Sequence, residues 1–246
     1  MERRPPARRD LRFQMQRILQ SELLDTLPAN DPSAVRSRAD LRRVNRWLGH
    51  HRILARAIDS ATRNGVQRIV DLGAGDGTFA LSLAKRLHKR WPEVELHLAD
   101  RQRSAHPETI NALHRLGWKT REIEAEVFDW LTTPVERTDV IFANLFLHHF
   151  DDAELRRLLR GIAARTDRFV ALDPRRGFIS CAACPLLWLL GCNRVTRHDG
   201  RVSARAGFRG CELSALWPDD DEWLLEERAA GCFSHLFVAK RRSGCG

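Results

Sequence analysis

A short stretch with three glycines and two acids carries the clearest chemical signal in the chain. It lies between an apolar run and a segment with helical spacing, and it reads Asp71-Leu72-Gly73-Ala74-Gly75-Asp76-Gly77. Glycines at such a turn let the chain reverse tightly and let a ligand approach the backbone amides. Its third glycine comes one position too early for a dinucleotide-binding fingerprint. The carboxylate of Asp71 would repel a diphosphate but attract a cationic amino-acid group, so the stretch predicts a positively charged ligand.

Two further acids follow later apolar runs. Asp100 comes directly after residues 95–99, and Asp129 comes directly after residues 122–128. Because the carboxyl ends of parallel strands meet at one edge of a sheet, these acids would gather beside the glycine turn. Asp100 could accept from both hydroxyls of a ribose. Asp129 could accept from an adenine amino group while Phe128, Trp130 or Leu131 offers an apolar face. The alternative is that both acids serve only as turn or helix-cap residues.

The elements that would position these acids alternate between short apolar runs and helical segments. We expect strands over 68–72, 95–99, 122–128, 139–143 and 169–172, with helices over 78–90, 106–117 and 151–165. Such alternation predicts crossover connections and a mainly parallel sheet. Strand-like runs over 222–228 and 233–240 are joined by a connection short enough for a hairpin, so we expect the sheet to end with an antiparallel strand.

The first 61 residues have a different pattern. Residues 1–10 are rich in arginine and proline and are expected to be frayed. Helical spacing of apolar residues predicts one helix over 11–27 and a second helical stretch over 33–61, interrupted at Gly49. We therefore divide the chain into an N-terminal tail and helical cap, residues 1–61, and a ligand-binding domain, residues 62–246.

The order of these motifs resembles that of the class I S-adenosylmethionine-dependent methyltransferases over about residues 66–240. The residues that carry the resemblance are the glycine turn, Asp100, Asp129-Trp130 and the run from Asp139 to Asn144. The resemblance implies an α/β, Rossmann-like fold with a seven-stranded sheet whose last strand is antiparallel, and S-adenosylmethionine as cofactor. By analogy, Asp71 and the turn surround the methionine part, Asp100 holds the ribose, and Asp129 with Trp130 meets the adenine. We place Ala74, Arg101 and Asn144 in the same cofactor-binding set.

The residues after the fourth expected strand bear on the methyl acceptor. They read Asn144-Leu145-Phe146-Leu147-His148-His149-Phe150 and lack the Asn/Asp-Pro-Pro-aromatic loop seen in methyltransferases that act on base amines or glutamine amides. The sequence is similar to the small-molecule branch, and residues 195–213 resemble bacterial tailoring enzymes of secondary metabolism. The resemblance therefore favours O-methylation of an aromatic, quinone or polyketide acceptor.

Histidines are the candidate catalytic residues. A phenol with a pKa near 10 is a better nucleophile beside a base that is poised near neutrality, and histidine suits that role. The candidates are His149, His198 and His148. The alternative is that each only lines the cleft or the core, with catalysis arising from positioning alone.

Residues 179–192 are expected to form a wall or lid of the acceptor pocket. The segment is apolar nearly all round, which predicts that it buries itself, with Trp188 facing the acceptor. Phe146 and Arg175 complete the expected substrate-binding set. An ordinary core helix is the alternative.

The six cysteines all lie in the C-terminal third of the chain. Cys181 and Cys184 have metal-site spacing, but two further ligands at a suitable distance are missing. We expect reduced thiols and no metal.

Composition limits the partners. The net charge is +9, but only four of the 41 basic residues are lysines and the arginines are scattered, so nucleic acid is not the favoured partner. No apolar stretch is long enough to span a membrane and no signal sequence is recognisable, which favours the cytoplasm. A homodimer is left open. The competing functions are an RNA or protein methyltransferase and a non-catalytic cofactor-binding module of the same fold.

Overall fold

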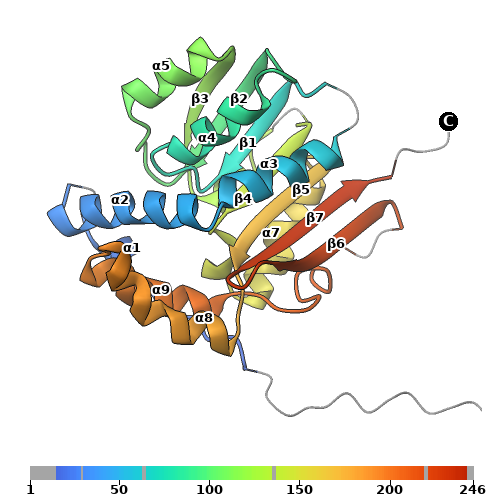
Figure 1. Cartoon of the computed structure of the whole chain (residues 1–246). Coiled ribbons are helices and arrows are strands. Elements are labelled where there is room, and N and C mark those ends of the chain that lie inside the picture. Colours follow the sequence, from blue (N-terminus) through green and yellow to red (C-terminus); the bar gives the residue numbers. More distant parts are fainter. Residues whose placement is uncertain (1–14, 29, 63–64, 135–136, 219–220, 243–246) are drawn as a thin grey trace, which may run out of the picture.

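A seven-stranded sheet forms the centre of the protein, with helices on both faces (Figure 1). The computed structural model describes residues 15–28, 30–62, 65–134, 137–218 and 221–242. The strand order is β3-β2-β1-β4-β5-β7-β6, and β7 alone runs in the opposite direction to the other six strands. The strands are β1 (Arg68–Leu72), β2 (Val94–Asp100), β3 (Trp118–Glu124), β4 (Val140–Asn144), β5 (Arg168–Pro174), β6 (Trp223–Ala230) and β7 (Ser234–Arg241). The predicted α/β fold with an antiparallel last strand is confirmed.

Two separate apolar layers cover the sheet. On one face α3 (His50–Ala61), α4 (Thr78–Leu87) and α5 (Pro107–Arg115) bury residues such as Leu54 and Leu83 against Ile69 and Phe142. On the other face α7 (Asp152–Ala163) packs over Ile141. Because both faces are covered, the central strands consist of continuous apolar runs and not of alternating apolar and polar residues.

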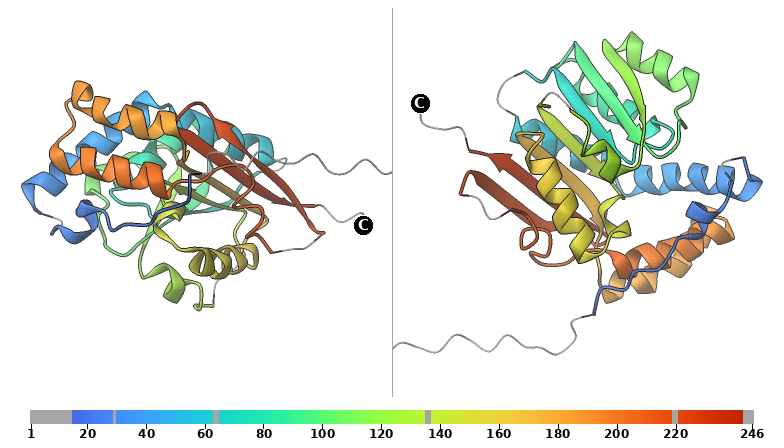
Figure 2. Two further views of the ribbon diagram at one scale, coloured as in Figure 1. Left: turned by 90° about the horizontal axis from the view of Figure 1, so that it is seen from below. Right: turned by 180° about the vertical axis from the view of Figure 1, so that it is seen from behind.

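A further group of helices lies beyond the carboxyl edge of the sheet (Figures 1 and 2). It comprises α1 (Leu23–Thr26), α2 (Pro32–Trp47), α6 (Val127–Trp130), the 3-10 turn η1 (Leu147–His149), α8 (Phe178–Ala183), the 3-10 segment η2 (Cys184–Leu190) and α9 (Arg194–Ala206). A buried polar cluster joins α2 to α9, with the Ser37 and Thr196 hydroxyls 2.8 Å apart and the Thr196 hydroxyl 3.1 Å from Asp40 Oδ2. The described residues contain no helix that is long and apolar enough to cross a membrane.

Three expectations about local structure are wrong. Residues 15–22 form no helix; only Leu23–Thr26 do, and the tail over 1–10 lies outside the described residues. The third strand begins earlier than expected and ends at Glu124, so Asp129 lies in the short helix α6. Residues 179–192 do not bury themselves, because Trp188 and its large apolar neighbours are exposed. The break at Gly49 is confirmed by the separation of α2 from α3.

Helix α3 buries its apolar face against the sheet in the same layer as α4. The division of the chain at residues 61 and 62 stays a prediction.

Two glycines with the same backbone conformation test how tightly the sheet edge is packed. A Cβ on Gly117 would lie 1.9 Å from the carbonyl oxygen of Pro92, whereas one on Gly231 would meet nothing within 4 Å; both residues have a φ of about +80°. We expect Gly231→Ala to lower the free energy of unfolding by about 1 kcal/mol. Gly117→Ala should lower the free energy of unfolding by the same amount and by a further packing cost of about 1–3 kcal/mol. Urea unfolding measures both, and equal losses would contradict the close approach of the Pro92 carbonyl to Gly117.

Candidate functional site

A cavity of about 750 Å³ lies at the carboxyl ends of β1, β2 and β4. Its floor contains Gly73, Gly75 and Asp100, and the residues after β4 form one side. The opposite side is residues 19–27, which belong to a segment that we call the N-terminal strap, residues 15–27. Figure 2 shows this strap crossing α9 on its way to α1. The cavity therefore lies between the strand ends and a covering segment from the start of the chain.

The glycine turn forms the floor, and at Gly73 it has no room for a larger residue. Gly73 has a φ of +74°, and a Cβ there would lie 2.5 Å from a ring carbon of Phe146. Asp100 holds the turn in place, since its Oδ2 accepts from the Gly75 amide at 2.9 Å and its Oδ1 accepts from the Gln102 amide at 3.1 Å. Each carboxylate oxygen keeps a further lone pair, so Asp100 can still accept hydrogen bonds from a ligand.

Asp71 lies beneath the turn and is buried. Its Oδ2 has no hydrogen-bond partner among the described residues. Burial and the nearby charge of Asp100 raise the pKa of the Asp71 carboxyl well above its usual value. A cationic group near the turn would therefore stabilise the ionised form, which is the chemistry expected from the sequence.

The remaining predicted cofactor residues divide between the cavity wall and the region outside it. Trp130 and Arg101 line the cavity. Trp130 is almost fully buried, and the Arg165 guanidinium lies 5.1 Å from the centre of the Trp130 ring. The indole nitrogen of Trp130 has no hydrogen-bond partner in the described part of the chain. Outside the wall lie Ala74, Gly77, Asp129 and Asn144, together with the buried Asp71.

The chain is strained where it leaves β4. Leu145 has a φ of +56° and is the one non-glycine residue of the described segments with a positive φ. Its amide donates to the carbonyl of Leu172 at 2.8 Å, and the residue lines the cavity. Such strain persists only where the surroundings enforce it, and it concentrates at functional sites. Here it turns the chain so that Phe146 and His149 face the cavity.

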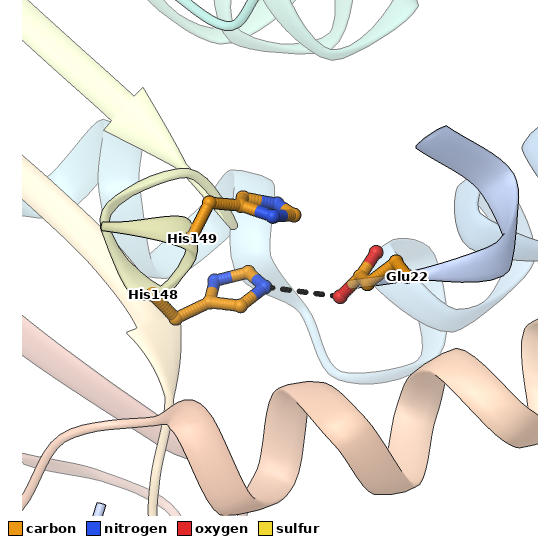
Figure 3. A group of neighbouring side chains, drawn as sticks. All are labelled: Glu22, His148 and His149. Atoms are coloured by element: carbon orange, nitrogen blue, oxygen red, sulfur yellow. Dashed lines mark hydrogen bonds and ion pairs between the residues drawn. The ribbon is translucent and has the colours of Figure 1, made fainter. Parts of the chain in front are cut away.

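His148 lies in a buried row of charges. Its Nδ1 is 2.8 Å from Asp173 Oδ1, and its Nε2 is 3.3 Å from Glu22 Oε1 of the strap (Figure 3). Burial alone would lower the pKa of His148, but the two carboxylates outweigh it and raise that pKa to about 9. Burial likewise acts to raise the pKa of Glu22, and its bonds to His148 and to the Ser203 hydroxyl lower it to about 2. His148 is therefore a cation at neutral pH.

His149 has the opposite character. It lines the cavity, and its ring centre lies 4.2 Å from that of His148 (Figure 3). Burial and the charge on His148 lower the pKa of His149, although Asp25 of the strap lies 3.7 Å from its Nδ1 and acts in the other direction. A neutral imidazole that faces a cavity can accept a proton.

Glu22, His148 and His149 together could hold a metal ion, because their ligand atoms all lie within 4.8 Å of one another. An ion would have to displace the proton that His148 shares with Glu22, and the raised pKa of His148 opposes that exchange. The arrangement fits a proton-bridged ion pair better than a metal site. That no metal is needed stays a prediction.

Polar contacts hold the strap in place. Asp199 of α9 accepts from the amides of Leu23 and Leu24 at 2.8 and 3.0 Å. Arg17 donates to the carbonyls of Phe150 and Ala206 at 2.6 and 2.8 Å. The strap is thereby attached both to α9 and to the turn that carries the histidines.

The other predicted catalytic and substrate residues lie apart from one another. Phe146 lines the cavity and meets Phe150 edge to face at 5.1 Å. His198, Arg175 and Trp188 lie outside the cavity wall. His198 is half exposed, with its Nδ1 3.0 Å from Asp199 Oδ1, and the Arg175 guanidinium is 3.4 Å from the carbonyl of Gly231.

Sequence reasoning missed Glu22, Asp25 and Asp173 as site residues. Asp173 was available as an acid at the end of a strand, like Asp100. Glu22 and Asp25 are two acids in a strongly basic N-terminal region, which is a weak signal. Among the described cysteines, Cys184 and Cys192 are buried, Cys181 is half-buried, and Cys211 and Cys232 are exposed; all five are free, and Cys245 lies outside the described residues.

Part of the chain is similar to known proteins. Residues 69–179, from β1 to the start of α8, match the family model described as a methyltransferase domain. A trans-aconitate 2-methyltransferase from Rhodococcus jostii is 36% identical over 94 residues, which cover 38% of this chain and 32% of that protein. The match thus spans about a third of the relative's length.

Solved structures share the fold. The plantazolicin methyltransferase BamL, in complex with a triazolic desmethylPZN analog and SAH, has a TM-score of 0.61 at 12% identity, covering 88% of this chain and 92% of that one. An O-methyltransferase family protein from Burkholderia thailandensis has a TM-score of 0.51 at 18% identity, covering 88% and 64%. The resemblance inferred from the motifs is confirmed.

The raised pKa of His148 predicts a pH-dependent stability. The contribution of its proton is fully present below pH 6.5, the unfolded value, and is lost as the pH rises through about 9. Over that interval the free energy of unfolding should fall by at most about 3 kcal/mol. Urea unfolding at a series of pH values measures the fall, and His148→Gln should remove it. If the free energy of unfolding of that variant fell with pH as it does in the wild type, the raised pKa would not belong to His148. NMR titration measures the pKa of His148 independently, with its resonance identified as the imidazole signal that is missing from the variant.

Proposed function

We propose, on the premise that residues 69–179 are a class I methyltransferase domain, that the whole chain transfers a methyl group from S-adenosylmethionine to a small molecule beside His149. The observation that carries the proposal is one cavity whose wall contains Gly73, Gly75, Asp100 and His149. The cofactor-type floor and the candidate base thus share one space.

The residues at the floor fit the expected cofactor. The unpartnered buried oxygen of Asp71 lies beneath the turn, where a cationic amino-acid group would offset its charge. A Cβ on Gly75 would meet nothing within 4 Å, so space for a ligand is open there. Asp100 offers its carboxylate to the ribose hydroxyls, and Trp130 offers an apolar face to the base. When bound, the cofactor supplies an electrophilic methyl group on a sulfonium.

The protein's own contribution is to hold and deprotonate the acceptor. His149, neutral because of its lowered pKa, accepts the proton of an acceptor hydroxyl through an imidazole nitrogen. The positive charge of His148 and the carboxylates of Glu22 and Asp173 hold the turn in position. The strap covers part of the side opposite the strand ends and helps to hold the acceptor, so that positioning supplies much of the rate.

The partly covered site favours a small acceptor. Strap residues form part of the cavity wall, which disfavours RNA or a folded protein as acceptor, and Leu24, Phe146 and Phe150 add apolar side chains to a wall that is otherwise largely polar. This lining suits an aromatic, quinone or polyketide hydroxyl, and we propose O-methylation within secondary metabolism. Location in the cytoplasm and a homodimer stay predictions.

Asp100 and Asp129 give a matched test of cofactor binding. Both were expected to bind the nucleoside, but only Asp100 lies in the cavity wall. Asp100→Ala should weaken S-adenosylmethionine binding by about 1.5–3 kcal/mol, the value of hydrogen bonds to a charged group. Asp129→Ala should leave binding within a few tenths of a kcal/mol. Isothermal titration calorimetry compares them, after urea unfolding has shown that both variants are folded. Equal affinities would count against a ribose at Asp100.

His149 and His198 give the matched test of catalysis. With a labelled methyl donor and an acceptor found by screening phenols, quinones and trans-aconitate, His149→Ala should lower turnover about 10²–10⁴-fold while cofactor affinity persists. His198→Ala should retain turnover. Wild-type turnover should rise with pH through an apparent pKa below 6.5, since the base must be neutral. If both variants stay fully active, catalysis by positioning alone becomes the better account. If no screened acceptor is methylated while the cofactor binds, the non-catalytic alternative is favoured.

A further inference from the structure

Five large apolar side chains stand exposed on α8 and η2. Phe178 is 81% exposed, Ile179 61% and Trp188 59%, and Leu186 and Leu189 are also exposed. They come from one continuous stretch of 12 residues, 178–189, and we call this surface the α8–η2 face. Figures 1 and 2 place α8 beside α9 and away from the sheet. Grouped exposure of this kind marks an interaction surface, whereas scattered single apolar residues do not.

The segment is attached to the protein through its small residues. The Cys184 thiol donates to the carbonyl of Gly200 in α9 at 3.2 Å, and the Ser180 hydroxyl donates to the carbonyl of Cys232 at 3.4 Å. Leu187 is the one large residue of this attachment, and its side chain packs against Gly200. Because Ser180, Cys184 and Leu187 face the protein, the five exposed side chains point outward as a consequence of folding.

Arginines border both ends of η2. At the start of η2, the charge of Arg201 acts to lower the pKa of the Cys184 thiol. Just past the end of η2, the charges of Arg43 and Arg197 act to lower the pKa of the Cys192 thiol. Arg43 donates to the carbonyl of Gly191 at 3.2 Å and is paired with Asp40, whereas Arg201 is exposed. The surface therefore combines an apolar centre with a cationic border.

We propose that the α8–η2 face docks on the surface of an anionic lipid bilayer. Its aromatic and aliphatic side chains would enter the boundary between headgroups and acyl chains, where tryptophan is favoured, and the arginines would meet acidic headgroups. A second copy of the chain fits less well, because a two-fold contact through this face would bring the same arginines together. The described helices include none that could span a membrane, so the contact is with the surface.

Vesicle sedimentation of the full chain tests the proposal. We expect binding to phosphatidylcholine vesicles that contain phosphatidylglycerol, weaker binding to pure phosphatidylcholine, and a decrease with added salt. The double variant Phe178→Ser and Trp188→Ser should lose affinity about tenfold or more. The matched control is Leu224→Ser with Leu225→Ser on β6, where the side chains are 50% and 41% exposed, and it should bind as the wild type does.

Four results would overturn the proposal. The first is wild-type protein that stays in the supernatant with anionic vesicles, or binds neutral vesicles equally well. The second is an equal loss in the β6 control. The third is a dimer in light scattering that the Phe178 and Trp188 substitutions dissociate, which would make a second copy the occupant.

Circular dichroism and urea unfolding confirm that each variant is folded. Arg197→Glu with Arg201→Glu should weaken anionic binding at least as much as the serine variant, and unchanged binding there would also contradict the charge requirement.

Discussion

The ion pair between Glu22 and His148 joins the strap to the turn that follows β4, and the geometry of the cavity depends on it. Glu22 lies in the strap, between residues that line the cavity, and His148 lies at the strand ends with Asp173 behind it. All three charges are shielded from water, so removal of one partner would leave the others uncompensated at a large cost. The pair therefore fixes the cover of the cavity and the electrostatic surroundings of His149 together.

Two adjacent histidines with opposite protonation follow from this arrangement. The two carboxylates raise the pKa of His148, whereas burial and the charge of His148 lower the pKa of His149. Neighbouring groups whose surroundings separate their pKa values are typical of acid–base sites. In the proposed reaction the charged ring holds the turn and the neutral ring faces the acceptor.

The parts of the site that the sequence predicted are those that local pattern determines. Asp100 lies at the end of a strand and Gly73 in a tight turn, and both line the cavity; that they bind the cofactor stays a prediction. The placement of Asp129 depended on the end of the third strand, which lies five residues before it. Glu22 could not be found in this way, because the position of the strap is set by its contacts with α9, which leave no periodic pattern in the sequence. The expected burial of residues 179–192 was wrong for a related reason. The apolar composition indicates that the segment has an apolar partner, but it does not say whether that partner belongs to this chain.

In the proposed reaction, one cavity holds the donor and the acceptor on the same side of His149. A crystal structure with S-adenosylhomocysteine tests this most directly. We expect the ribose hydroxyls at the Asp100 carboxylate, and the sulfur directed toward the space beside His149. A nucleoside bound elsewhere, or a sulfur directed away from His149 with the strap still in place, would contradict the account.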